Sequence, residues 1–104
     1  MFIPSSADIH QDHGVIHNEG VRAFKNVTIL GYELPWNNLS VHLQCGISLD
    51  SDHIELKIKA LAQYASQGSR SYFSEDFIRS LSLVRGIQFN TRQAEAFEVI
   101  RFCA

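Results

Sequence analysis

The chain has 104 residues, of which 45% are hydrophobic and 19% charged, as in an ordinary globular protein. This length predicts one domain over residues 1–104, with a core of modest size. A net charge of -2, with nine scattered lysine and arginine residues, makes nucleic acid a poor candidate partner.

The first predicted helix follows a polar loop. Residues 1–3 are expected to end a strand, and a loop rich in serine and aspartate covers residues 4–12. Asp12 occupies the position of an N-cap for a helix over residues 13–25. Small and apolar residues recur at three- and four-residue steps and predict one packed face: Ile16, Gly20, Ala23 and Phe24.

Two strands are predicted next. β-Branched and aromatic residues favour a strand over residues 27–34, and the proline and asparagines of residues 34–38 end it in a loop. Residues 41–49 show the clearest period-two pattern of the chain, which predicts a strand with one buried face. That face would consist of Val41, Leu43, Cys45, Ile47 and Leu49.

Two further helices are predicted in the second half. Possible caps at residues 50–52 precede a helix over residues 53–66, and a loop over residues 67–72 follows it. The apolar stripe of this helix would be Ile54, Ile58, Leu61 and Ala65. A third helix opens at residues 74–76, where acidic side chains suit the helix dipole, and is expected to end at Gly86. It would direct Phe77, Leu81 and Val84 inward.

The last segment, residues 94–102, allows two interpretations. Phe97 and Val99 favour a strand, whereas the run Ala-Glu-Ala-Phe-Glu favours a helix by propensity. In either case the alternation of helices and strands indicates an α/β architecture.

The chemistry is concentrated in residues 8–13, Asp-Ile-His-Gln-Asp-His. Two histidines three residues apart, with aspartates before and between them, lie at a loop-to-helix junction. Imidazole and carboxylate groups suit zinc, and the start of a helix favours an anion. On spacing alone, structural or surface histidines are the commoner outcome, so the residues by themselves leave both interpretations open.

This segment resembles the HxDH motif of the PIG-L/LmbE family of zinc-dependent deacetylases, which act on N-acetylglucosamine-type substrates. The likeness extends along nearly the whole chain, in matching order. It includes the helix that ends Arg-Ala-Phe-Lys at Lys25, the "LGYE" strand, the "K..AL..Y.SQ" helix, and the closing "RG" and "AEAFE" segments. The resemblance is the reason to predict a strand over residues 94–102.

The resemblance also implies roles for individual residues. It makes His13 the zinc ligand and His10 the group that stabilises the oxyanion near the substrate carbonyl. It makes Asp12 the residue that orients His10. Asp8 is expected to line the same pocket, and Trp36 could contact an amino sugar or simply cover the core.

One departure from the family pattern is large. The "HPDDE"-like motif that supplies the family's other zinc ligands and its carboxylate base is absent from this sequence. One histidine cannot hold a catalytic zinc ion, which usually has three protein ligands. The resemblance therefore implies a C-terminal half of the enzyme fold, a partial Rossmann-like layered sheet with about three helices, completed by self-association as a dimer.

Three functions follow as alternatives. The chain is a truncated deacetylase without activity of its own, or a half-enzyme completed by a partner chain, or a non-catalytic oligomeric interaction module. Elsewhere we expect His17 to be a hydrogen-bonded helix-face residue, and His42 and His53 to lie at the surface. No apolar run reaches the roughly eighteen residues of a membrane span, and no signal peptide or disulfide pattern is evident, which predicts a cytoplasmic protein.

Overall fold

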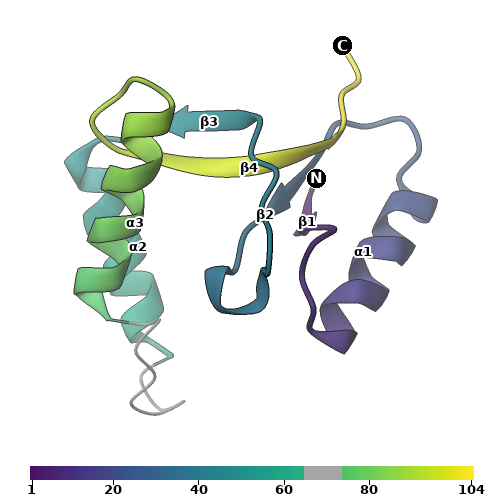
Figure 1. The fold of residues 1–104 in the computed structure, drawn as a ribbon, viewed down its shortest axis with the longest axis horizontal. Coiled ribbons are helices and arrows are strands. Elements are labelled where there is room, and N and C mark those ends of the chain that lie inside the picture. The colour runs from purple at the N-terminus through teal and green to yellow at the C-terminus, as the bar shows by residue number, and fades with distance from the viewer. Residues whose placement is uncertain (65–73) are drawn as a thin grey trace. The chain divides into compact units, whose positions relative to one another are not determined.

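The computed structural model describes residues 1–64 and 74–104 as a mixed α/β fold (Figure 1). Its strands are β1 (Phe2–Pro4), β2 (Ile29–Tyr32), β3 (Cys45–Ser48) and β4 (Ala94–Arg101). They form a four-stranded sheet in the order β1-β2-β4-β3, with β1 parallel to β2 and β2 antiparallel to β4. The α-helices of the described residues are α1 (Gln11–Ala23), α2 (Ser51–Ala62) and α3 (Glu75–Gln88). The predicted α/β class, with about three helices, is thus confirmed.

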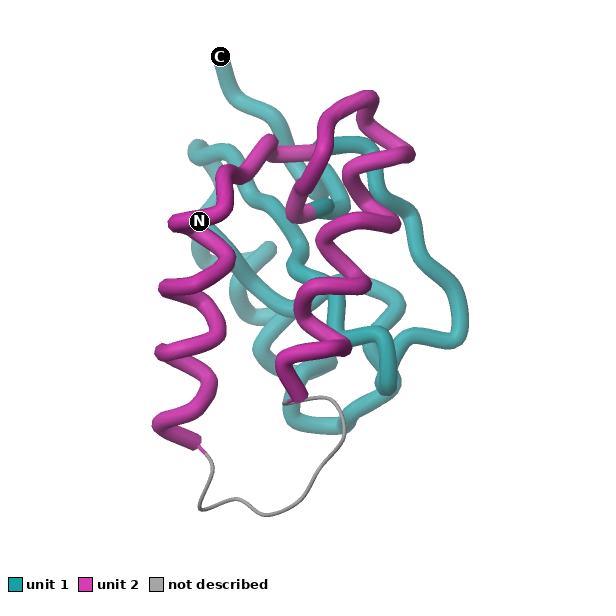
Figure 2. Tube along the Cα trace, turned by 90° about the vertical axis from the view of Figure 1, so that its left-hand side faces the viewer, with its two compact units in different colours: residues 1–45, 96–104 teal, residues 46–95 magenta. Residues whose placement is uncertain are grey.

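The chain is organised into two compact units (Figure 2). Unit 1 consists of Met1–Cys45 together with Ala96–Ala104, and unit 2 consists of Gly46–Glu95. All the residues that the sequence analysis assigned to a functional site, from Asp8 to Trp36, belong to unit 1.

The core of unit 1 brings α1 against the parallel pair of strands. Ile3 of β1 and Ile29 of β2 are buried. Phe97 of β4 is also buried, and its ring centroid lies 5.3 Å from that of Phe2. Gly20 of α1 lies against Ile3, since a Cβ at Gly20 would come within 3.1 Å of that side chain. This close approach holds α1 beside the segment that leaves β1 and carries the predicted site.

The N-terminus of α1 differs from the prediction. The helix begins at Gln11 rather than at residue 13, and its N-cap is His10. The His10 side chain accepts a hydrogen bond from the backbone N–H of Asp12. The prediction of Asp12 as the N-cap was therefore wrong, because an imidazole nitrogen performs that role two residues earlier.

The predicted packed face of α1 was also largely wrong. Ile16 and Phe24 are exposed, whereas Gly20 is buried as expected. Apart from Gly20, the less exposed positions on α1 are half-buried: His13, Gly14, His17 and Val21. Hydrogen bonds from the two histidines to the preceding segment, and the close contact at Gly20, outweigh apolar periodicity in setting the orientation of this helix.

Helix α2 is capped as predicted but is displaced toward the N-terminus. Asp50 and His53 form a reciprocal capping box, with bonds of 3.0 and 3.2 Å between backbone N–H groups and side chains. Ile54, the first residue of the predicted stripe, is fully buried. Ala65 and the predicted loop over residues 67–72 lie outside the described residues.

Helix α3 continues past Gly86, where the sequence predicted its end. Gly86 lies inside the helix because the chain folds back over it, and a Cβ there would come within 2.4 Å of the carbonyl oxygen of Arg92. The buried face of α3 is Ile78, Ser82 and Gly86, whereas Val84, predicted to point inward, is exposed. As with the other helices of the described residues, α3 is not long and apolar enough to cross a membrane.

The strand predictions for residues 94–102 and 41–49 had opposite outcomes. Residues 94–101 form β4, which confirms the prediction of a strand there rather than a helix. The strand predicted over residues 41–49 is limited to Cys45–Ser48 and has no continuous buried face, since Ile47 is exposed. Within unit 2, Phe89 lies where a side chain at Gly46 would be, with its ring 2.2 Å from the position of a Cβ. A period-two pattern in the sequence cannot predict a tertiary contact of this kind.

Candidate histidine–carboxylate site

A short turn connects β1 to α1 and sets the position of Asp8. The backbone N–H of Ser5 donates to the carbonyl of Tyr32 at 3.0 Å, and that of Asp8 donates to the carbonyl of Ser5 at 3.2 Å. The next residue, Ile9, donates to the carbonyl of Asn37 at 2.9 Å. The turn over residues 5–8 is thus held at both ends by the β2 segment and the loop that follows it.

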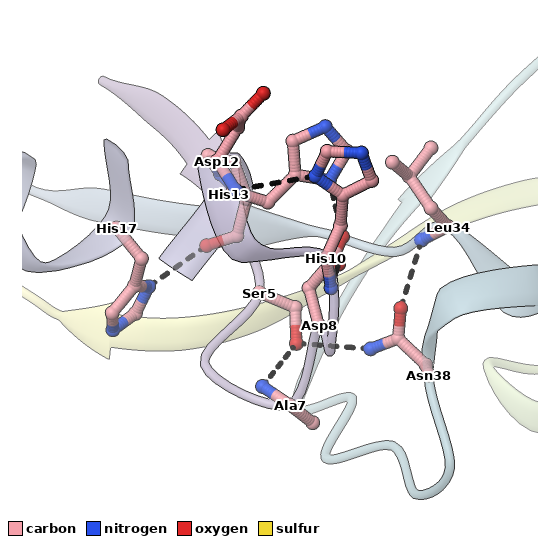
Figure 3. Close-up of polar contacts among 10 residues, drawn as sticks. Ser5, Ala7, Asp8, His10, Asp12, His13, His17, Leu34 and Asn38 are labelled. Atoms are coloured by element: carbon pink, nitrogen blue, oxygen red, sulfur yellow. Dashed lines mark hydrogen bonds and ion pairs between the residues drawn. The ribbon is translucent and has the colours of Figure 1, made fainter. Parts of the chain in front are cut away.

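The Asp8 carboxylate organises the histidines (Figure 3). Its side chain has no solvent exposure, and Oδ1 accepts the backbone N–H of His10 at 2.8 Å. Oδ2 lies 2.8 Å from Nδ1 of His13, a ring that retains 25% exposure. A carboxylate can only accept, so Nδ1 of His13 carries a proton. In the neutral ring, Nε2 of His13 is left with its lone pair.

His10 has the opposite tautomer. Its Nδ1 accepts the backbone N–H of Asp12 at 3.2 Å, so the proton of the neutral ring resides on Nε2. The rings of His10 and His13 stack with centroids 4.4 Å apart and an interplanar angle of 27°. The stacked pair therefore offers one unprotonated nitrogen, from His13, and one N–H donor, from His10.

The contacts of the two aspartates differ from those expected from the sequence. Among the described residues, the hydrogen bond between Asp12 and His10 comes from the backbone of Asp12, and its exposed carboxylate forms no bond to His10. Asp8, expected only to line the pocket, is the carboxylate that orients a histidine, and that histidine is His13.

The other histidines match the plainer expectations. Nδ1 of His17 lies 2.8 Å from the carbonyl oxygen of Pro4, to which it donates, so His17 is a hydrogen-bonded helix-face residue. His42 is exposed, and His53 belongs to the cap of α2. In residues 1–64 and 74–104, no three histidine, cysteine, aspartate or glutamate side chains are grouped so that they could hold a metal ion.

Trp36 lies on a loop that is tied to the site. It is the middle residue of the 3-10 segment η1 (Pro35–Asn37) and is 42% exposed. Asn38 connects this loop to the turn, because its amide donates to the Ser5 hydroxyl at 3.2 Å and accepts the N–H of Leu34 at the same distance. Trp36 is therefore anchored near the turn with an exposed ring, as either of its predicted roles allows.

Two titratable residues near the site had no assigned role in the sequence analysis. The pKa of Tyr32 is raised, first by burial and then by the negative charge of Asp8. Burial alone would raise the pKa of Glu98, but hydrogen bonds from Ser6 and Ser5 and the charge of His17 lower it overall. Both residues stand in motifs that carried the family resemblance, "LGYE" and "AEAFE", although neither motif indicated a function for them.

Comparison with family models, curated proteins and solved structures finds no match to this chain.

Proposed function

We propose that this chain carries the histidine half of a zinc-dependent N-deacetylase site of the PIG-L/LmbE type. The observation that supports this most strongly is the buried Asp8 carboxylate, which keeps the proton of His13 on Nδ1 and its lone pair on Nε2. In zinc sites, carboxylates that do not themselves bind the metal orient the histidine ligands in this way. The substrate class would be an amide of N-acetylglucosamine type.

The residues fit zinc in part. His13 would bind the ion through Nε2, where it would supply a Lewis acid for amide hydrolysis. His10 is poorly suited as a second ligand, because a metal at its Nε2 would displace the proton while Nδ1 is already an acceptor for the cap of α1. Its Nε2–H suits the stabilisation of negative charge that develops on the substrate carbonyl oxygen.

The described residues do not provide the remaining ligands or the carboxylate base. We therefore propose a chain that is inactive by itself and retains the partial Rossmann-like layering of such an enzyme. A second copy would cover its exposed apolar surface. Completion of the site by a partner chain is the alternative, and Trp36 would then be placed to contact the amino sugar.

Zinc titration of the metal-stripped chain tests this proposal. We expect weak binding, because a single histidine ligand provides far less than the roughly 10–16 kcal/mol of a structural zinc site. In nitrogen NMR of the imidazole rings, Nε2 of His13 should respond at lower zinc concentrations than the exposed ring of His42. In calorimetry, His13→Ala should remove most of the heat of zinc binding, and His42→Ala, the matched control, should leave it unchanged.

The outcomes are distinct. If His13 and His42 respond at the same zinc concentration, or if His13→Ala has no effect, the metal role of His13 is refuted. We expect no deacetylation of N-acetylglucosamine by the chain alone, and turnover that persists after zinc removal would contradict a zinc-dependent site.

A further inference from the structure

The Glu98 side chain of β4 accepts hydrogen bonds from the turn between β1 and α1. One carboxylate oxygen accepts the backbone N–H of Ser6 at 2.8 Å, and the other accepts the Ser6 hydroxyl at 2.5 Å. These bonds join residues 92 positions apart in the sequence. Both oxygens of one side chain thus hold the single residue at the centre of the turn.

Glu98 anchors the middle of the turn, whereas the other bonds to the turn hold its ends. Ser5, the first residue of the turn, is hydrogen-bonded to β2. Ile9, the residue that follows the turn, is hydrogen-bonded to the loop at Asn37. The middle of the turn is tied to the sheet by Glu98. Gly31 of β2 leaves the necessary room, since a Cβ there would lie 3.1 Å from the Cα of Ser5 and 3.3 Å from the Glu98 carboxylate.

We propose that Glu98 is a positioning residue, which holds the turn so that Asp8 keeps His13 in the Nδ1–H tautomer. The inference rests on the proposed function, in which Nε2 of His13 is the working atom. Asp8 begins the chain of contacts that reaches the histidines, with 2.8 Å bonds to both His10 and His13. A rotation of the turn would redirect the Asp8 carboxylate away from the His13 ring.

A carboxylate accepts both donors of Ser6 at once. Ser6 presents one N–H and one O–H donor, and each oxygen of Glu98 accepts one of them. In Glu98→Gln the NH₂ group can donate to the rotated Ser6 hydroxyl and so retain both contacts, whereas Glu98→Ala leaves both donors without this partner. Hydrogen bonds to charged groups are also stronger than bonds between neutral groups.

The test compares Glu98→Ala and Ser6→Ala with Glu95→Ala as the control. Glu95 lies on the same strand but pairs with Lys57 at 2.5 Å in unit 2. The readout is the tautomer of His13, from ring-nitrogen NMR of the full chain at alkaline pH, where imidazole is neutral. We expect wild type and Glu95→Ala to hold His13 as Nδ1–H, and Glu98→Ala to shift most of the population to Nε2–H.

Ser6→Ala keeps the backbone N–H and removes only the hydroxyl, so it should shift the tautomer in the same direction by a smaller amount. Ser6 is exposed, so this variant keeps the proposal testable if Glu98→Ala fails to fold. Folded variants in which His13 stays fully Nδ1–H would overturn the positioning role. A wild-type His13 that is already Nε2–H would instead refute the proposed function, so the two failures are separable.

Discussion

At the scale of the residue, the assignment of the orienting role to Asp8 rather than Asp12 is open to a direct test. Asp8→Asn keeps the shape of the side chain and an oxygen for the N–H of His10, but places an NH₂ group against Nδ1 of His13. His13 must then accept at Nδ1 and carry its proton on Nε2. We expect this tautomer reversal in NMR, with a loss of about 1–3 kcal/mol in the free energy of unfolding.

Asp12→Asn is the matched control for this change. Its exposed carboxylate makes no bond to His10 in the described residues, and its backbone N–H, which caps α1, is retained. The ring tautomers of His10 and His13 should therefore be unaltered. A reversal caused by Asp12→Asn and not by Asp8→Asn would restore the role that the family motif implied for Asp12.

The candidate site could be located from the sequence, but its internal contacts could not. Two histidines three residues apart at a helix start are close in any helical conformation, so their proximity follows from spacing. The choice between Asp8 and Asp12 depends on a turn that is set by bonds to β2 and β4. Those partners are distant in sequence, and local patterns contain no information about them.

At the scale of the element, two helical glycines provide a comparison of local and tertiary constraints. Gly14 of α1 has no atom within 4 Å of a Cβ position, so Gly14→Ala should gain about 0.5–1 kcal/mol from helix propensity. At Gly86 of α3, a Cβ would come within 2.4 Å of one backbone carbonyl oxygen and 2.6 Å of another. Because backbone cannot move aside as easily as a side chain, Gly86→Ala should lose about 1–3 kcal/mol.

Chemical denaturation of the two variants measures both effects. The two changes in the free energy of unfolding need not be equal in size, but they must have opposite signs. A stabilised Gly86→Ala protein would mean that the chain following α3 does not pack on this glycine. Gly86 also explains why the end of α3 was predicted wrongly. A glycine near the end of a helical pattern marks either the end of the helix or a close tertiary contact, and only the fold distinguishes the two.

At the scale of the whole molecule, the small core leaves much apolar surface uncovered. Only a few large apolar residues of the described chain are fully buried, whereas many are at least two-fifths exposed. On α3 the exposed residues are adjacent in helical spacing and form a stripe opposite the buried face: Leu83, Val84 and Ile87. Because contiguous exposed apolar patches mark surfaces that another chain covers, this stripe is the place on α3 where we expect a partner to pack. The sequence predicted the amphipathic character of α3 but placed Val84 on the wrong side, because both faces carry apolar residues.

We predict that the chain self-associates through this stripe. Ile87 is 83% exposed, and burying an isoleucine side chain contributes about 1.5–3 kcal/mol, on each copy of a two-fold dimer. Sedimentation at micromolar concentration should show a dimer, and Ile87→Lys should weaken it by at least about tenfold while leaving helicity unchanged. Asn18→Lys, the same charge at an exposed position of α1, should leave the dimer intact.

Since dimerisation stabilises the folded chain by mass action, the melting temperature of the wild type should also rise with concentration. A well-folded wild-type monomer would refute the dimer, and with it the idea that a second copy completes this fold.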